Sequence, residues 1–189
     1  MLIGLCGYAA CGKDTAAQVL IEEFSFQRVA FAEPIKHALL ALDPFVPGTE
    51  PGSFLRLSEL SETLDWTKIK EYPEVRRLMQ ILGTEVGRNL FDPDIWVKLA
   101  ESKLASTLSV GNTVVTDVRF PNEARLIKRH GGTLVRLVRP GLGPVNEHLS
   151  DRASESWTYD YHIENGDDVT SLHQKMRELV VQLEQIQHG

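Results

Sequence analysis

The chain has 189 residues, 42% of them hydrophobic and 24% charged, and its formal net charge is −6. This length suits one domain with room for a small insertion, and the composition is ordinary for a globular protein. The acidic balance argues against a protein that grips long nucleic acid, because such proteins carry a surplus of basic residues. The absence of any run of about 18 apolar residues argues against a membrane-spanning helix.

The N-terminal segment combines a short apolar run with both cysteines of the chain, Cys6 and Cys11. Their close spacing argues against a disulfide framework and predicts a reducing compartment, the cytoplasm. Residues 1–6 carry no basic residue and lead directly into a glycine-rich loop, so a signal peptide is not expected.

Short apolar runs alternate with helical patterns in the first part of the chain. Residues 2–6 are a predicted buried strand, residues 13–24 repeat apolar side chains at helical spacing, and residues 26–31 are a second strand candidate. A helix is expected over 33–42. Residues 43–57 are rich in proline and glycine, and this composition predicts a loop.

The rest of the chain continues the alternation. Helices are predicted at 58–70, 73–89, 93–107, 121–130 and 172–186, and strands at 113–117, 133–138 and 161–163. This order predicts an α/β fold, with a five-stranded parallel sheet flanked by helices. Ligands of such sheets bind at the carboxyl ends of the strands, where Gly7, Asp117 and Arg139 are expected.

The most informative local motif follows the first strand. Residues 7–15 match the phosphate-binding pattern Gly-x-x-x-x-Gly-Lys, with Asp14 where Ser or Thr is usual. The glycines let successive main-chain N–H groups face inward, and the helix that begins at Lys13 adds the positive end of its dipole. Lys13 is expected to reach the outer phosphates of ATP. The predicted contacts are Gly7, Ala10, Cys11, Gly12, Lys13, Asp14 and Thr15.

Three oxygen-bearing side chains are candidates for Mg²⁺: Asp14, Thr15 and Asp117. Asp14 either replaces the usual hydroxyl or only adds a negative charge at the helix N-terminus, with Thr15 contacting phosphate. Asp117 either holds waters of Mg²⁺ or acts as a base toward an alcohol acceptor. Cys11 is expected to be a small filler of the loop rather than a redox sensor.

Cationic side chains recur beyond the loop. A kinase that joins two anionic substrates needs cations to offset the repulsion between phosphates. The candidates are Lys36, Arg76, Arg77, Arg88, Arg119, Arg139 and Arg152, with Gln80 beside them. Arg119 lies at a strand end and is favoured as functional, whereas Arg125, Lys128 and Arg129 are expected to be surface residues. A phosphate acceptor is already ionised, so no general base is required.

Other classes that bind phosphate through glycine-rich loops fit less well. No Asn-Lys-x-Asp and no Asp-x-x-Gly follows the loop, which argues against a GTPase switch. No Gly-x-Gly-x-x-Gly follows the first strand, which argues against a dinucleotide-binding oxidoreductase.

Five blocks of the sequence resemble the phage-type deoxynucleoside monophosphate kinases, a family of P-loop nucleotide kinases. They are residues 7–15 with Gly-Lys-Asp-Thr, Phe31-Ala-Glu-Pro-Ile-Lys36, Arg77-Leu-Met-Gln80-Ile-Leu-Gly-Thr-Glu85 with Arg88 and Trp96, Thr116-Asp117-Val-Arg119-Phe-Pro-Asn122-Glu123, and Arg139-Pro140 with His148-Leu-Ser150 and residues 160–165. Together these blocks run from the first strand almost to the last helix.

The resemblance implies a single P-loop kinase domain over 1–189 with three parts. The core is expected at 1–31, 108–140 and 159–189, a helical acceptor-binding region at about 32–100, and a lid at about 141–158. The lid would close over the substrates and exclude water. The resemblance also implies the cytosol of a phage-infected or bacterial cell, and it leaves the oligomeric state open, with a homodimer as one option.

The resemblance further implies roles for individual residues. Lys36, Arg77, Gln80, Arg88 and Trp96 would bind the acceptor nucleotide, with Asp117 nearby, and Trp96 could equally be a core residue. Arg119 would contact the acceptor phosphate, and Arg139 or Arg152 would neutralise the charge of the transferred group. His148 would anchor the lid rather than act in catalysis.

The sequence therefore predicts an enzyme that moves phosphate in line from ATP, with Mg²⁺, to a (deoxy)nucleoside monophosphate. The preference for deoxyribose comes from the resemblance alone. Two alternatives stay open: another small-molecule kinase of the same fold, of the dephospho-coenzyme A or phosphomevalonate kinase type, and a non-catalytic nucleotide-binding module.

Overall fold

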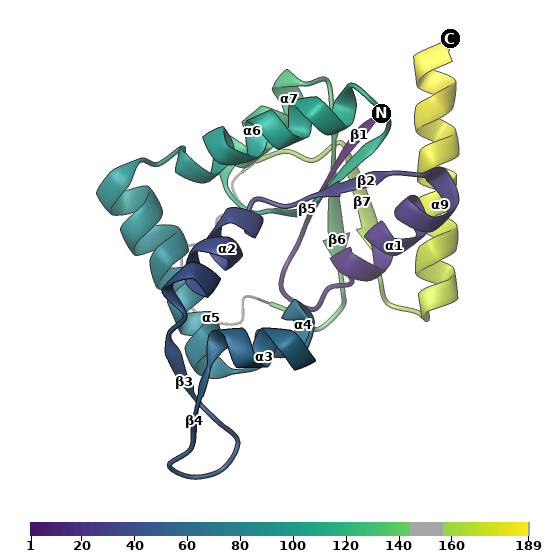
Figure 1. Ribbon diagram of the computed structural model, residues 1–189. Coiled ribbons are helices and arrows are strands. Elements are labelled where there is room, and N and C mark those ends of the chain that lie inside the picture. The colour runs from purple at the N-terminus through teal and green to yellow at the C-terminus, as the bar shows by residue number, and fades with distance from the viewer. Residues whose placement is uncertain (144–156, 189) are drawn as a thin grey trace. The chain divides into compact units, whose positions relative to one another are not determined.

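A computed structural model describes residues 1–143 and 157–188, and the chain divides into two compact units (Figure 1). The core unit contains Met1–Phe31 and Ala100–Gly189, and the second unit is Ala32–Leu99. The roles predicted for the core, the acceptor-binding region and the lid stay predictions. Residues 144–156, which make up most of the predicted lid, lie outside the described residues.

The core unit is built on a five-stranded sheet whose strand order is β2-β5-β1-β6-β7. Its strands are β1 (Leu2–Cys6), β2 (Gln27–Val29), β5 (Thr113–Val118), β6 (Thr133–Val138) and β7 (Tyr161–Glu164). Every neighbouring pair is parallel. The predicted five-stranded parallel sheet is therefore confirmed, although β2 is shorter than the predicted strand over 26–31.

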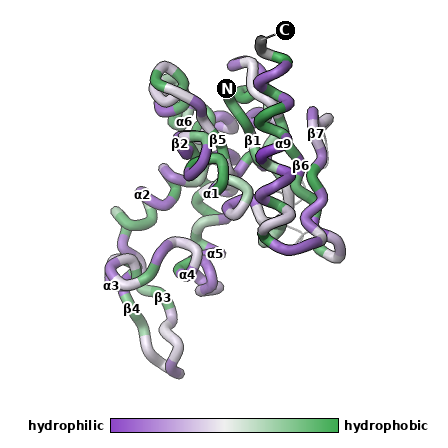
Figure 2. Tube along the Cα trace, turned by 90° about the vertical axis from the view of Figure 1, so that its right-hand side faces the viewer, coloured by the Kyte–Doolittle hydropathy of each residue, from purple (hydrophilic) through white to green (hydrophobic). Residues whose placement is uncertain are grey.

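Helices cover both faces of this sheet. On one face α1 (Lys13–Phe24) and α9 (Val169–His188) pack with Ile3, Leu5 and Val135 in one buried cluster. Side chains alternate along a strand, so Leu2 and Gly4 face the opposite side, where α7 (Pro121–Arg129) packs. In Figure 2 the strands β1 and β6 are largely hydrophobic, whereas α9 alternates between hydrophobic and hydrophilic residues, as expected of a helix with one buried face.

Close packing explains one glycine of the sheet. A Cβ atom on Gly4 would lie 3.1 Å from Ile127 Cγ1 and 3.2 Å from Leu134 Cδ2. The missing side chain therefore lets α7 approach β1 closely.

The second unit has its own buried cluster, made of Leu39, Val46, Leu57, Leu60, Ile69 and Val75. Its elements are α2 (Glu33–Leu42), β3 (Phe45–Pro47), β4 (Phe54–Arg56), α3 (Leu57–Thr63), α4 (Trp66–Ile69), α5 (Pro73–Gln80) and η1 (Ile81–Phe91). The helix α6 (Ile95–Leu108) then continues into the sequence of the core unit.

The predicted loop over 43–57 is wrong in part, because the segment contains an antiparallel hairpin of β3 and β4. The amide of Gly48 donates to the carbonyl of Ser53 at 2.9 Å and closes the turn, in which Gly52 has φ of +79°. Val46 is fully buried and anchors the hairpin in the cluster of the second unit. The loop was predicted because the segment is rich in proline and glycine, and its apolar residues form no run long enough to predict a strand.

The helices predicted over 58–70 and 73–89 are each divided. The first ends at Thr63, and Asp65 caps α4 by accepting hydrogen bonds from the amides of Thr67 (2.7 Å) and Lys68 (3.1 Å). The second changes after Gln80 into η1, a wider helix that closes with a bond from the amide of Asp92 to the carbonyl of Gly87. Wide helical turns of this kind are uncommon and often occur at functional segments.

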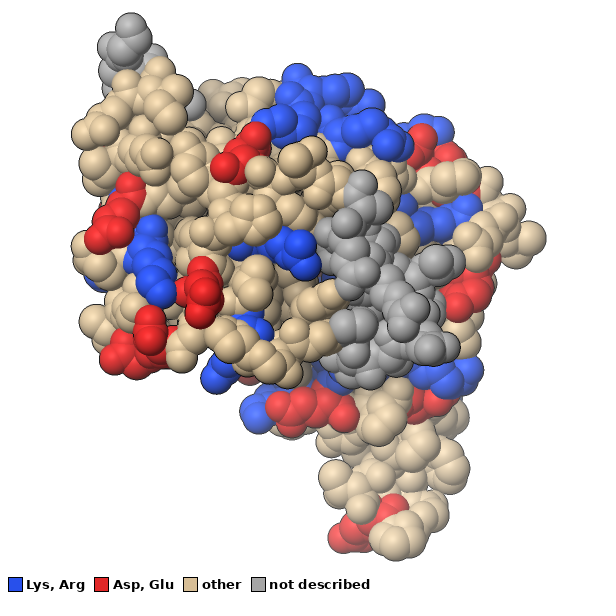
Figure 3. All heavy atoms as spheres, turned by 180° about the vertical axis from the view of Figure 1, so that it is seen from behind, with Lys and Arg blue, Asp and Glu red and all other residues tan. Residues whose placement is uncertain are grey.

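Charged side chains lie mostly beside partners of opposite sign. On the face drawn in Figure 3, several basic groups lie next to acidic ones, and others gather in a basic patch at the upper edge. Lys128, for example, is 2.9 Å from a carboxylate oxygen of Asp160. Within residues 1–143 and 157–188, no helix has both the length and the apolarity that crossing a membrane would require.

Candidate functional site

The loop between β1 and α1 folds into a tight turn that begins and ends with a glycine in a left-handed conformation. Gly7 and Gly12 have φ angles of +136° and +101°, and Ala10 has φ of 60°. A Cβ atom on Gly7 would collide with the carbonyl oxygen of Leu137, and one on Gly12 would lie 2.5 Å from Asn165 Nδ2. Both glycines are thus required by backbone angle and by space.

Helix α1 begins directly at this loop. Its N-cap is Gly12, which has a left-handed backbone conformation and no side chain that could cap the helix. The first main-chain N–H groups of a helix have no partner within the helix, and they carry its positive dipole end. The loop and the helix start therefore form a cup of main-chain donors suited to an anion.

The side chain of Lys13 lies inside this loop and is only 9% exposed. Its Nζ donates to the carbonyl oxygens of Gly7 (2.8 Å) and Tyr8 (2.6 Å) and lies 3.6 Å from Cys11 Sγ. Burial lowers the pKa of Lys13, and the positive charge of Arg119 lowers it further, whereas the Cys11 thiol opposes this shift. A buried cation held by neutral carbonyls would gain strongly from an anionic partner.

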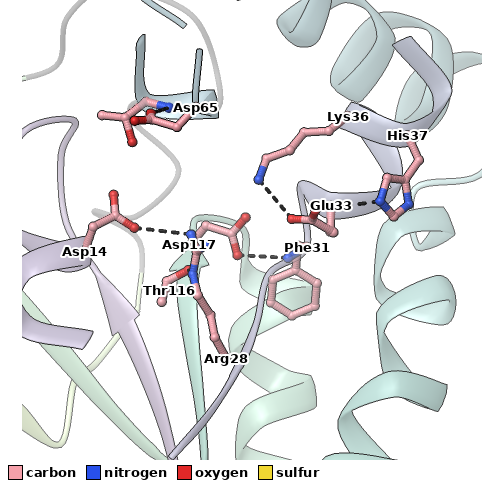
Figure 4. A network of polar contacts seen from close by, with 10 residues as sticks. Asp14, Arg28, Phe31, Glu33, Lys36, His37, Asp65, Thr116 and Asp117 are labelled. Atoms are coloured by element: carbon pink, nitrogen blue, oxygen red, sulfur yellow. Dashed lines mark hydrogen bonds and ion pairs between the residues drawn. The ribbon is translucent and has the colours of Figure 1, made fainter. Parts of the chain in front are cut away.

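Asp14 is the second residue of α1, and its side chain is 80% exposed. Its Oδ1 accepts a hydrogen bond from Arg28 Nη2 at 3.2 Å, and Arg28 Nε donates to Thr116 Oγ1 at 3.3 Å (Figure 4). Arg28 was not among the predicted site residues. The sequence signal that could have indicated Arg28 is its position as a charged residue within a short predicted strand.

Asp117 lies near the end of β5. Its Oδ1 accepts a hydrogen bond from the amide of Phe31 at 2.8 Å, as Figure 4 shows. This bond joins the ends of β5 and β2, so Asp117 has a structural task in addition to any role toward a ligand. A carboxylate has room for several hydrogen bonds, and the two tasks are compatible.

Arg119 begins the turn from β5 into α7. Glu123 Oε2 accepts the amides of Arg119 (2.7 Å) and Phe120 (3.0 Å), and Glu123 is 2% exposed. This buried carboxylate fixes the turn that carries Arg119. Arg139 follows β6 and is exposed. The core unit thus places the loop, Asp117, Arg119 and Arg139 at the carboxyl ends of its strands, as predicted.

Three candidate cations of the second unit, Lys36, Arg77 and Arg88, have a partner within that unit. Lys36 is 5% exposed, donates to Glu33 Oε2 at 2.9 Å, and lies 5.6 Å from the centre of the Trp66 ring. Arg77 forms a two-pronged contact with Glu74, at 2.8 and 2.6 Å. This contact raises the pKa of Arg77 and lowers the pKa of Glu74.

Two further candidates of the second unit are buried. Trp96 is 5% exposed, and its indole N–H donates to the carbonyl of Gly83 at 2.6 Å. Arg88 is 8% exposed, and its Nη1 donates to the carbonyl of Pro93 at 2.9 Å. Gln80 ends α5 and is half-buried. Arg152 and His148 lie outside the described residues.

A parallel α/β core with a glycine- and lysine-containing anion loop after its first strand defines the P-loop class of nucleotide-binding proteins. The family model of deoxynucleotide monophosphate kinases matches residues 46–176, which is more than half of the chain. The chain therefore belongs to the deoxynucleotide monophosphate kinase family, and the predicted resemblance is confirmed.

Individual relatives agree with this assignment. A mimivirus protein (Acanthamoeba polyphaga mimivirus) that carries the deoxynucleotide monophosphate kinase name is 33% identical over 165 residues, covering 80% of each chain. The deoxynucleotide monophosphate kinase of phage T4 is 27% identical over 84% of this chain and 65% of its own. The deoxynucleoside-5'-monophosphate kinase of phage T5 is 27% identical over 82% of this chain and 84% of its own.

Solved structures give a weaker likeness. The dephospho-CoA kinase of Campylobacter jejuni is 16% identical over 96% of both chains, with a TM-score of 0.49. Likeness at this level adds nothing to the fold that the strand order itself defines.

Proposed function

We propose that the chain transfers a phosphoryl group from ATP to a (deoxy)nucleoside monophosphate and so forms a diphosphate. Membership in the deoxynucleotide monophosphate kinase family supports this acceptor class. The single observation that carries the proposal is the cup formed by residues 7–15, with its left-handed glycines and the buried Lys13. Main-chain donors at a helix N-terminus are suited to the outer phosphates of a triphosphate.

In this proposal, catalysis is positioning combined with charge. The acceptor phosphate is already ionised, so the transfer needs no side chain to remove a proton. Lys13 exchanges its carbonyl partners for phosphate oxygens. Arg119 contacts the acceptor phosphate, and Arg139 or Arg152 neutralises charge on the transferred group. Arginine suits these tasks because its planar fork matches phosphate oxygens.

The core unit also offers oxygen ligands that fit Mg²⁺. This ion prefers hard oxygen donors and is commonly held by one or two carboxylates together with substrate phosphates and water. Asp14, Thr15 and Asp117 supply such oxygens, and within the described residues no cluster of three His, Cys, Asp or Glu side chains forms a closed metal cage. When bound, Mg²⁺ offsets negative charge on the phosphates.

We further propose that the second unit supplies acceptor-binding residues. Lys36, Arg77 and Gln80 would contact the nucleotide. Arg77 would exchange its contact with Glu74 for a contact with substrate, which costs little because both side chains are partly exposed. Arg88 donates to the carbonyl of Pro93 and Trp96 to the carbonyl of Gly83, so we propose that these two residues support the region through packing.

An acceptor panel tests the proposal directly. Purified protein is mixed with ATP, Mg²⁺ and each common ribo- and deoxyribonucleoside monophosphate, and nucleoside diphosphate is quantified by chromatography. Turnover of at least one monophosphate is expected. Turnover confined to a non-nucleotide acceptor, such as dephospho-coenzyme A or phosphomevalonate, would replace the proposal with another kinase of the same fold. ATP binding without any transfer would indicate a nucleotide-binding module.

A further inference from the structure

The last strand of the sheet contributes a side chain to the phosphate loop. Asn165 directly follows β7 and is 9% exposed. Its Nδ2 donates to the carbonyl oxygen of Cys11 at 3.0 Å, and its own amide donates to the carbonyl of Val138 at 2.7 Å. The residue is therefore fixed to the end of β6 by its main chain and to the loop by its side chain.

This contact fixes the direction of one donor in the cup. In a planar trans peptide, the carbonyl of one residue and the N–H of the next point in opposite directions. When Asn165 holds the Cys11 carbonyl on the outer side of the loop, the N–H of Gly12 must face the opposite side. Gly12 stands next to Asn165 with no Cβ between them, since such an atom would lie 2.5 Å from Nδ2.

The contact differs from the other side-chain contacts to the loop. Lys13 also holds loop carbonyls, those of Gly7 and Tyr8, but under the proposed function it leaves them when phosphate binds. Asn165 is uncharged, and its amide can hold the Cys11 carbonyl whether or not an anion is present. A carboxylate at this position could not donate and would repel both the carbonyl and an incoming phosphate.

We infer that Asn165 is a positioning residue that orients the Gly12 N–H toward the phosphates of the bound nucleotide. This inference rests on the proposed use of the loop for ATP. It assigns to the segment after β7 a role in phosphate binding, whereas in the sequence analysis Asn165 lay only within residues 160–165 of the family resemblance.

The test compares ligands with and without phosphates. Asn165→Ala removes the donor, and Asn165→Leu removes it while keeping comparable side-chain volume. For both variants, calorimetry is expected to show an ATP affinity about tenfold weaker, the range of one hydrogen bond to a charged group. The affinity for adenosine, which has no phosphate, and the KM of the acceptor are expected to stay unchanged.

Lys175→Met is the matched control. Lys175 Nζ donates to the carbonyl of Glu164, the residue before Asn165, at 2.8 Å, and to Asp167 Oδ2 at 3.2 Å. If loosening of the strand end were the cause, this variant would weaken ATP binding as much as Asn165→Ala. Unchanged ATP affinity in Lys175→Met supports the inference.

Several outcomes would overturn it. If Asn165→Leu binds ATP as tightly as the unmodified chain, the residue only fills space. Equal loss of ATP and adenosine affinity, together with a lowered melting temperature, would assign Asn165 a general structural role. Should Asn165→Ala fail to fold, Asn165→Leu carries the comparison. Failure of the unmodified chain to bind ATP would instead refute the proposed function.

Discussion

The phosphate loop and the Ala32–Leu99 unit present their polar groups in different ways. In the loop, the donors are main-chain N–H groups, and their directions follow from the backbone angles of residues 7–12. In the second unit, the candidates are side chains that neighbours already hold: Lys36 contacts Glu33, and Arg77 contacts Glu74. The geometry of a main-chain site therefore follows from the local sequence. A side-chain site forms only when its side chains leave their present partners and contact the ligand.

The largest loss of activity is expected from a change of Lys13, the side chain that supplies a positive charge to the loop. Lys13→Ala removes the cation from the cup and should lower kcat by about 10³-fold or more, because a lost phosphate clamp costs several kcal/mol in the transition state. Steady-state kinetics with ATP and the best acceptor measure this loss.

Lys36→Met is the matched comparison in the second unit. It removes a buried ammonium of the same kind, and it should raise the acceptor KM by about tenfold while leaving the ATP KM unchanged. If Lys36→Met lowered kcat as much as Lys13→Ala does, Lys36 would act in the transfer step itself. The contrast between the phosphate loop and the Ala32–Leu99 unit would then be wrong.

The second largest effect separates backbone angle from space. Gly12 and Gly52 both have positive φ, +101° and +79°, but a Cβ on Gly52 would meet nothing within 4 Å. Each change to alanine should cost about 1–2 kcal/mol of unfolding free energy through the backbone angle. Only Gly12→Ala should also weaken ATP binding, by more than about tenfold, because the new methyl group displaces Asn165 and turns the loop.

Chemical denaturation and ATP titration of the two glycine variants measure these quantities. Equal ATP affinity in both variants would show that the loop tolerates the collision with Asn165. The prediction that ATP affinity depends on the shape of the loop at Gly12 would then be wrong.

These contrasts explain how much the sequence could predict. The parallel sheet and the loop were predictable because apolar periodicity and the Gly-x-x-x-x-Gly-Lys spacing are local properties. The hairpin in 43–57 was missed because its strands are short and its fully buried residue, Val46, lies within a Pro- and Gly-rich segment. Arg28 and Asn165 were missed because their contacts to Asp14 and Cys11 join residues that are distant in sequence.

A change of Arg119 is expected to have a smaller effect than Gly12→Ala, and one confined to the acceptor. Its side chain is carried by the turn that Glu123 fixes, so Arg119→Ala should leave the fold intact. The expected result is a rise of about tenfold in the acceptor KM, with the ATP KM changed less than twofold. An effect confined to ATP affinity would show that Arg119 serves the donor instead.

Glu123→Gln serves as the comparison for Arg119. It keeps the shape of the side chain but weakens the acceptance of two main-chain amides, those of Arg119 and Phe120. It should therefore lower the melting temperature, whereas Arg119→Ala should not. A normal melting temperature in Glu123→Gln would show that the turn does not depend on this carboxylate.

The smallest effect on substrate binding is expected at Trp96, for which the sequence allowed either acceptor binding or core packing. Trp96→Phe removes the donor to the Gly83 carbonyl and leaves that oxygen without this partner, at a cost of about 1–3 kcal/mol in unfolding free energy. The acceptor KM should change little. Trp66→Phe is the control, since Trp66 is half-buried against the second unit's cluster and the substitution keeps an aromatic ring beside Lys36. If Trp96→Phe raised the acceptor KM at unchanged stability, Trp96 would belong to the binding site, and the second unit would recognise its ligand through an aromatic ring as well as through cations.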